Sequence, residues 1–193
     1  MPIPSEIRTP RLLLRPWRAD DAPALLPVLE ANRAHIGPWI PARVAQPVEV
    51  PLLAQRLAGF GAAFDQDREW RFGMFARDDG RVLGEIDLFA RNAEGRVALH
   101  ESDRGELGYW LRSDATGQGL VVEGARAALG VAAELNRFAH VEIRCDLRNA
   151  PSVAVARRLG FSLANTIADD PIRDGDPPVT LQVWTSRLEP FTK

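Results

Sequence analysis

The chain has 193 residues, of which 46% are hydrophobic and 26% charged, a balance typical of a soluble globular protein. Its 24 basic and 26 acidic residues give a formal net charge of −2, which disfavours general binding to nucleic acid or to an anionic membrane. Cys145 is the only cysteine, so the chain can form neither an internal disulfide nor a zinc site of several thiols. The sequence shows no signal-peptide layout and no apolar run of the ~20 residues that a membrane span needs. We therefore expect a cytoplasmic protein.

The basic residues are almost all arginine, and Lys193 is the only lysine among the 24. The arginines are scattered along the chain, which indicates a compositional bias more than an anion-binding patch. The three histidines, His35, His100 and His140, are far apart and match no spacing of metal ligands. We expect no metal.

The first part of the chain predicts one strand followed by helices. A strand is expected over residues 12–15 and a helix over about 20–31. Pro27 should kink or shorten that helix, because proline lacks the N–H that would bond four residues back. Apolar residues at i, i+4 and i+7 from Leu53 predict a second helix.

The middle of the chain changes to the period of a strand. Alternating apolar residues over 70–74, a turn at 78–80 and a strand over 82–89 predict a hairpin. Further turns lead to expected strands at 97–99 and 105–111. The whole segment predicts an antiparallel meander of three or four strands.

The last third alternates helices and strands. Apolar residues recur at helical spacing over 122–132, and every second residue over 141–147 is apolar. Cys145 falls on the buried face of that strand. A short helix capped by Asn149 follows, and a final hairpin spans 161–186. The fold class is α+β with a central mixed sheet.

The glycine-rich turn at 116–121 is the strongest candidate for a ligand site. Gly117 and Gly119 let the backbone approach a ligand closely, and the first N–H groups of the helix that follows have no internal partner. These donors and the helix dipole suit a diphosphate. Such turns are also common as plain connections. The order of this turn and the later motifs, at 149–152 and 157–161, makes the interpretation more specific.

In combination, these motifs resemble the GNAT superfamily of N-acetyltransferases, and within it the Rim-type ribosomal-protein N-terminal acetyltransferases. The resemblance extends from about residue 8 to residue 187 and rests on Arg11–Pro16, Asn32–Ile36, Gly108–Leu111, Gly117–Gly119 with Glu123, and Asn149–Phe161. It implies a GNAT fold: a central mixed, mostly antiparallel sheet flanked by helices, with a V-shaped acyl-CoA cleft. We expect residues 1–193 to form one such domain.

The resemblance implies acetyl-CoA as the acyl donor. Backbone amides from Gly117 to Val121 would hold its diphosphate, and the backbone of Trp110 and Leu111 would pair with its pantetheine arm as an added strand. Asn149 would bond the arm from the other side. The residues expected to contact the donor are Tyr109, Trp110, Leu111, Thr116, Gly117, Gln118, Gly119, Leu120, Val121, Asn149 and Ser152.

Two features depart from the family's pattern. Thr116 and Val121 stand at the first and last positions of Gln/Arg-x-x-Gly-x-Gly/Ala. Many members also carry a tyrosine seven residues after the asparagine, as proton donor to the leaving thiolate. Here that residue is Ala156, and Tyr109 is the only tyrosine. The Rim-type resemblance offers Ser152 instead, and we predict that Ser152 is the catalytic acid.

The general base is predicted from carboxylates near the expected cleft. An α-amino group has a pKa of about 7.7–8.0, so a weak base suffices for an N-terminal substrate. Glu106 is our first candidate, with Glu85 on the neighbouring strand and Asp170 in the loop before the last hairpin as alternatives. Each of them can equally be a solvated surface carboxylate. An acidic run over 169–176 could attract a cationic acceptor.

The predicted function is acetyl transfer by direct attack of a primary amine, either a protein N-terminus or a small amine. Two alternatives stay open: a transferase that uses another acyl-CoA, such as succinyl-CoA, and a catalytically weak acyl-CoA-binding or regulatory module. The departures at Thr116, Val121 and Ala156 motivate the second alternative. The Rim-type resemblance also implies a homodimer.

Overall fold

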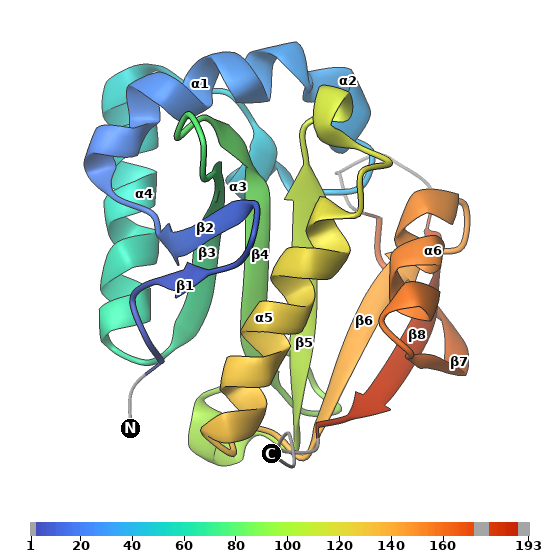
Figure 1. Cartoon of the computed structure of the whole chain (residues 1–193). Helices are drawn as coiled ribbons and strands as arrows, with labels where there is room; N and C mark the ends of the chain where they lie inside the picture. The colour runs from blue at the N-terminus through green and yellow to red at the C-terminus, as the bar shows by residue number, and fades with distance from the viewer. Residues whose placement is uncertain (1–2, 172–177, 189–193) are drawn as a thin grey trace.

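The computed structural model describes residues 3–171 and 178–188. Within these ranges the chain forms a mixed sheet of eight strands with helices on both of its faces (Figure 1). This arrangement confirms the predicted α+β class. Asp174 and Asp176, from the acidic run considered above, lie outside the described residues.

The strands follow the order β1-β2-β3-β4-β5-β6-β8-β7 across the sheet. Their bounds are β1 Ile7–Arg8, β2 Leu12–Pro16, β3 Glu69–Ala76, β4 Val82–Arg91, β5 Arg104–Leu111, β6 His140–Asp146, β7 Ser162–Asp169 and β8 Val179–Arg187. The helices are α1 Ala22–Ala31, α2 Arg33–Ile36, α3 Ala42–Ala45, α4 Val50–Asp65, α5 Leu120–Glu134 and α6 Ala150–Arg158. Three short 3₁₀ turns are η1 Ala19–Asp21, η2 Leu99–Glu101 and η3 Ser113–Ala115.

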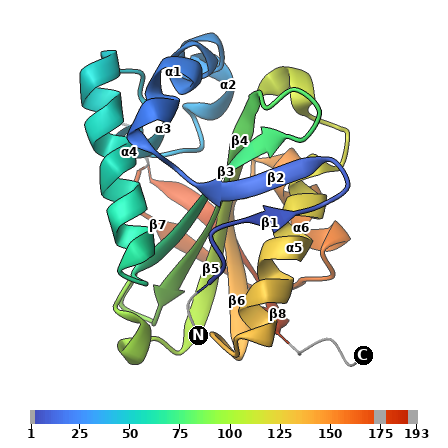
Figure 2. The same cartoon turned by 60° about the vertical axis from the view of Figure 1, so that its left-hand side comes forward.

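The two faces of the sheet are covered by different helices, with α5 and α6 on one side and α1 and α4 on the other (Figure 2). Ile86 of β4 belongs to the core under α5, and Gly124 lets that helix come close, since a Cβ there would lie 2.6 Å from Ile86 Cδ1. Trp110 of β5 belongs to the opposite core, with Leu29 of α1 and Leu57 of α4. Because side chains alternate along a strand, successive residues within β4, and within β5, point to opposite faces of the sheet.

The parallel pair β5–β6 is where the sheet opens. Its ladder has two residue pairs, Gly105–Val141 and Glu106–Glu142. The antiparallel ladder between β4 and β5, by contrast, continues to Leu111. Beyond Glu106, β5 and β6 diverge (Figure 1), which confirms the V-shaped sheet implied by the resemblance. Beyond Glu106, this edge of β5 therefore pairs with no other strand in the described part of the chain.

Two local predictions were wrong. The segment 97–99 is not a strand: Arg96 forms an isolated bridge with Arg91, and η2 follows directly. The meander between residues 69 and 111 therefore has three strands. Helix α1 is not shortened at Pro27 but continues to Ala31, because burial of its apolar face against α4 and the sheet outweighs the hydrogen bond that proline removes.

Candidate active site

The turn between β5 and α5 has the backbone shape of an anion site. Gly117 and Gly119 have φ of 75° and 76°, in the left-handed region that favours glycine. Gly119 is the N-cap of α5, and no side chain of the described residues caps this helix. The Thr116 hydroxyl instead donates to the carbonyl of Ser113, at 2.8 Å. The first N–H groups of α5 are therefore available to an anion.

These glycines also establish the register of the motif. With Gly117 and Gly119 at its two glycine positions, Asp114 stands first, where the sequence analysis placed Thr116. Asp114 pairs with Arg112, and Val121 lies inside α5 with its side chain buried. In this register only the first position of the motif, Asp114, departs from the family pattern. The predicted register had two departures, at Thr116 and Val121.

An ion pair ties the segment before β2 to this turn. The Arg11 Nε and the Thr9 hydroxyl each donate to the Glu123 carboxylate at 2.6 Å, and the Arg11 N–H donates to it at 2.9 Å. Arg11 Nη1 also donates to the Gln118 carbonyl, at 2.9 Å. Burial raises the pKa of Glu123, but the bonds from Thr9 and Arg11 outweigh it and leave the pKa lowered. The sequence pointed to Arg11 and Glu123 separately; only the structure pairs them.

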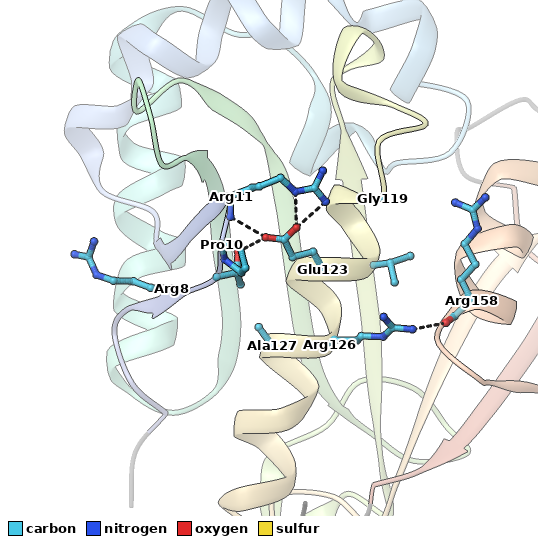
Figure 3. A pocket seen from close by; sticks show the side chains of 10 residues that line it. Arg8, Pro10, Arg11, Gly119, Glu123, Arg126, Ala127 and Arg158 are labelled. Atoms are coloured by element: carbon cyan, nitrogen blue, oxygen red, sulfur yellow. Dashed lines mark hydrogen bonds and ion pairs between the residues drawn. The ribbon is translucent and has the colours of Figure 1, made fainter.

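A pocket of about 710 Å³ lies beside this ion pair (Figure 3). The side chains of four arginines line it, Arg8, Arg11, Arg126 and Arg158, together with Gly119 at the start of α5. Arg126 reaches from α5 to α6, where it donates to the Arg158 carbonyl at 2.9 Å. With Glu123 already held by Arg11, the pocket suits an anionic ligand next to the glycine turn.

The unpaired edge of β5 presents particular backbone groups towards β6. The Arg112 N–H donates to the carbonyl of Leu83 in β4, at 2.8 Å. Because an antiparallel strand directs alternate residues to opposite sides, Leu111 and Tyr109 face β6. The Trp110 carbonyl faces β4, where it lies so close to Gly84 that a Cβ would collide with it. This orientation supports the prediction that the Leu111 backbone pairs with a pantetheine arm. It opposes the same prediction for the Trp110 backbone, which is already turned towards β4.

Helix α6 brings a hydroxyl pair to the opening of the V. The Asn149 Oδ1 caps this helix by accepting the Ser152 N–H, at 3.2 Å. The Ser152 Oγ lies 2.8 Å from the Tyr109 Oη, which also donates to the Ser152 carbonyl at 3.2 Å. Burial raises the pKa of Tyr109 far above its usual value, although the bond to Ser152 lowers it. Tyr109 therefore remains protonated at neutral pH.

The role of the Tyr109 side chain was not predicted from the sequence. The expected position for a proton-donating tyrosine was on α6, and Tyr109 was expected to contact the donor as part of β5. The only available signal was that Tyr109 is the one tyrosine in the chain. Cys145 of β6 also lies against this pair: burial raises the pKa of its thiol, and a hydrogen bond with Ser152 opposes that rise.

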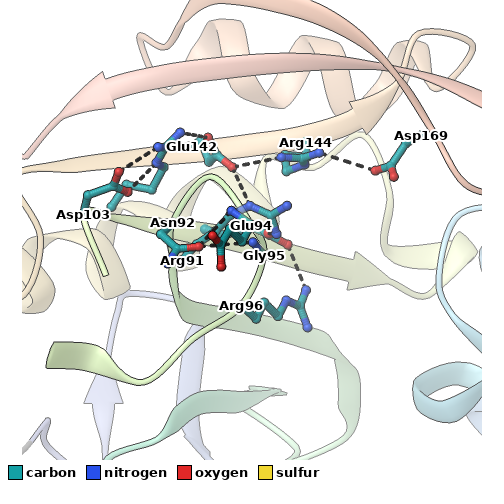
Figure 4. Close-up of polar contacts among 11 residues, drawn as sticks. Arg91, Asn92, Glu94, Gly95, Arg96, Asp103, Glu142, Arg144 and Asp169 are labelled. Atoms are coloured by element: carbon teal, nitrogen blue, oxygen red, sulfur yellow. Dashed lines mark hydrogen bonds and ion pairs between the residues drawn. The ribbon is translucent and has the colours of Figure 1, made fainter. Parts of the chain in front are cut away.

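Glu106, the first candidate for the base, is held by arginines at the vertex of the V. Its two oxygens accept from Arg91 Nη1 at 2.7 Å and from Arg96 Nη2 at 2.8 Å. Arg91 Nε also lies 3.1 Å from Glu142 of β6, which Arg144 contacts in turn (Figure 4). With both oxygens engaged by cations, Glu106 is better placed to join strands than to accept a proton from a substrate.

We expect Glu106→Gln to lower the free energy of unfolding by about 3 kcal/mol, because Arg96 loses its counter-charge and Arg91 keeps only Glu142. Acetyl-CoA affinity and the pH dependence of turnover should stay unchanged. Denaturant unfolding and a pH–rate profile measure these effects, with Glu101→Gln as an exposed control. A pH–rate profile altered at constant stability would restore Glu106 as a base.

The other sequence candidates have different surroundings. Glu85 is buried and accepts from Trp17 Nε1 and Arg71 Nη1. Asp170 is exposed at the end of β7. His35, His100 and His140 are exposed, and the described ranges contain no cluster of His, Cys, Asp or Glu suited to a metal. In the same ranges, no helix combines the length and apolar character needed to cross a membrane.

The structure has a glycine turn at a helix N-terminus, beside a sheet that opens between two parallel strands, as the sequence resemblance predicted. The family model for the acetyltransferase (GNAT) domain matches residues 11–162. The chain belongs to this family and is an acetyltransferase.

Known proteins similar to this chain agree with that assignment. The probable N-acetyltransferase YjcK of Bacillus subtilis is 23% identical over 150 residues, which cover 78% of this chain and 80% of YjcK. Among solved structures, the microcin C7 self-immunity acetyltransferase MccE, in complex with acetyl-CoA and AMP, matches with a TM-score of 0.82 and 16% identity. The match covers 95% of this chain and 97% of MccE.

Two further solved structures carry ribosomal-protein acetyltransferase names. An acetyltransferase from Salmonella typhimurium that modifies the N-terminal serine of ribosomal protein L7/L12 gives a TM-score of 0.78 at 20% identity, covering 97% of this chain and 99% of that one. RimL, with coenzyme A in disulfide linkage to one of its cysteines, gives 0.77 at 18% identity, covering 97% and 98%. At these identities the likeness establishes the fold.

Proposed function

We propose that this protein transfers the acetyl group of acetyl-CoA to a primary amine by direct attack on the thioester. The observation that carries the proposal is the unpaired edge of β5, which runs from the vertex of the V to the glycine turn of α5. A pantetheine arm laid along this edge places its diphosphate at one end and its thioester near the other. The Ser152–Tyr109 pair lies across the opening.

Donor binding follows from these groups. The N–H groups from Gly117 to Val121 would hold the diphosphate, and the arginines of the adjacent pocket would complement its remaining negative charge. The edge-facing backbone of Leu111 would pair with the arm, and Asn149 retains its Nδ2 donors for the opposite side.

The chemistry balances with the residues present. The neutral amine nitrogen forms a bond to the acyl carbon, the carbon–sulfur bond breaks, and the amine proton passes to a carboxylate. The departing thiolate takes a proton from the Ser152 hydroxyl, and Tyr109 returns a proton to Ser152 through their 2.8 Å contact. Solvent then reprotonates Tyr109, and the carboxylic acid releases the amine proton to solvent, so the amide and the CoA thiol are the net products. An edge-facing N–H of β5 polarises the thioester carbonyl.

The acceptor is either a peptide α-amine or a small amine. Succinyl-CoA as the donor would need an unpaired cation near the thioester. The arginines at the vertex, Arg91, Arg96 and Arg71, are each ion-paired with carboxylates, which favours the uncharged acetyl group. We also propose that residues 1–193 form one domain of this type. The homodimer, the cytoplasmic location and the absence of nucleic-acid partners stay predictions.

The decisive experiment is calorimetric titration with acetyl-CoA, followed by detection of released CoA in the presence of amines. The amines tested are peptides with free N-termini, N-blocked peptides containing lysine, and small polyamines; succinyl-CoA replaces acetyl-CoA in parallel. Micromolar donor binding with turnover is the expected result. Binding without turnover on any amine would instead make the protein an acyl-CoA-binding module.

A further inference from the structure

Asn32 belongs to one of the motifs behind the sequence resemblance, yet it takes no part in the chemistry proposed above. It lies at the corner between α1 and α2 and is 3% exposed. Both polar atoms of its side chain are bonded: Nδ2 donates to the Val28 carbonyl of α1, and Oδ1 accepts the Ser113 N–H, each at 2.8 Å. A buried amide with both ends satisfied is a specific tie between two segments. Here it joins α1 to a residue 81 positions further along the chain.

Ser113 lies near the start of the loop that carries the glycine turn. Residues 112–119 connect β5 to α5, and within this loop only Ala115 is buried. Because an exposed loop gains little from apolar packing, its hydrogen bonds largely decide its position. The Ser113 carbonyl accepts from the Thr116 hydroxyl at 2.8 Å, and Thr116 directly precedes Gly117. The position of Ser113 therefore affects the N–H groups that would hold the diphosphate.

The N-terminal part of the chain holds this loop at both of its ends. Arg11 holds the end next to α5, where its Nη1 donates to the Gln118 carbonyl at 2.9 Å. Asn32 holds the end next to β5, beside α2 at the top of Figure 1. Arg11 lines the pocket at the turn and can touch a ligand directly, whereas Asn32 is buried outside that pocket. An effect of Asn32 on donor affinity therefore acts through the loop.

We propose that Asn32 is a positioning residue for the acyl donor. By accepting the Ser113 N–H, it holds the loop in the conformation in which the backbone amides from Gly117 to Val121 are available to the diphosphate. A loop that is already held in place does not have to be ordered when the donor binds, which favours affinity. The corner between α1 and α2 thus contributes to donor binding, although none of the expected donor contacts lies on either helix. This inference rests on the proposed function and adds to it the residue that holds the turn.

Two substitutions at Asn32 separate positioning from stability. Asn32→Ala removes the acceptor of the Ser113 N–H, and we expect the affinity for acetyl-CoA, measured by calorimetry, to fall about tenfold. Asn32→Asp keeps an acceptor for this N–H but loses the donor to the Val28 carbonyl. It also places a carboxylate at the C-terminal end of α1, where the helix dipole disfavours it. Both variants should lower the melting temperature, but Asn32→Asp should keep an affinity within about threefold of the wild type.

Ser113→Pro tests the same bond from the loop, and it does so even if Asn32→Ala fails to fold. Proline lacks the N–H that Asn32 accepts. Ser113 is the first residue of η3, and Arg112 before it has φ of −62° and ψ of 148°, which suits a following proline. We expect Ser113→Pro to weaken acetyl-CoA binding as Asn32→Ala does, and to add nothing to it in the double variant. Ser113→Ala keeps the N–H and should bind as the wild type does.

Asp67→Ala is the control for losing a tie between distant segments. Asp67 accepts from Trp70 Nε1 at 2.8 Å and from Arg137 Nη1 at 2.7 Å, at the end of the sheet where β3 and β5 begin. It should lower the melting temperature without changing donor affinity. If Asn32→Ala or Ser113→Pro binds as the wild type does, or Asn32→Asp loses as much affinity as Asn32→Ala, the positioning role is overturned and the proposed function stands. Absence of acetyl-CoA binding in the wild type overturns both.

Discussion

Gly119→Glu is expected to abolish acetyl-CoA binding, with a loss of about 100-fold or more in affinity. The substitution places a carboxylate at the N-cap of α5, where the donor's diphosphate would lie. Like charges ~4 Å apart near a protein surface repel by roughly 4 kcal/mol. The side chain also enters a backbone with φ of 76°, which disfavours any residue with a Cβ. Calorimetric titration of the variant measures the loss.

The matched control for this variant is Gly80→Glu. Gly80 has a φ of 73° in the β3–β4 turn, and a Cβ there would meet nothing within 4 Å. The control therefore carries the same added charge and the same backbone penalty at a distance from the glycine turn. If both variants lose binding equally, the effect is one of folding and not of the diphosphate site. If Gly119→Glu binds as the wild type does, the donor does not use this turn.

Ser152→Ala is expected to lower kcat by about 100-fold, within the range that a general acid contributes, and to leave acetyl-CoA affinity unchanged. The helix cap survives the change, because Asn149 accepts from the backbone N–H of residue 152 and not from its hydroxyl. Tyr109→Phe should lower kcat by a smaller factor, since it removes the group that replenishes the proton and leaves Ser152 in place. Steady-state kinetics with a donor titration separate the two effects.

Ser102→Ala is the control for the loss of a part-buried hydroxyl, since Ser102 Oγ donates to the Leu99 carbonyl away from the cleft. It should change neither kcat nor donor affinity. A Ser152→Ala enzyme with full turnover would remove serine from the role of acid. Tyr109→Phe with the larger loss would instead assign that role to the phenol.

Much of the scaffold was predictable because its signals are local. The left-handed glycines of the turn at 117–119, the Asn149 cap of α6 and the alternation along β6 each depend on a few adjacent residues. Turn geometry, capping and strand alternation are short-range effects that any matching sequence meets in the same way. The motif order then identified the family, which the match over residues 11–162 confirmed.

The chemistry of the site depended on contacts between distant segments. Glu106 looked like a cleft carboxylate, but Arg91 and Arg96 approach it from another strand and its loop. Tyr109 reaches Ser152 across 43 positions of the chain, and Arg11 meets Glu123 across 112. Alternation predicts which face of a strand a side chain takes, but not which element will face it.

The sequence by itself therefore determined the fold class, the place of the glycine turn before α5 and the helix that carries Ser152. Only the tertiary structure decided which carboxylates are neutralised and which keep an open oxygen. The reason is physical: an ionisable group takes its role from the charges and burial around it, and the folded chain assembles those surroundings from strands far apart in sequence. Glu106, for example, has its two oxygens held by Arg91 and Arg96, which come from β4 and the loop that follows it.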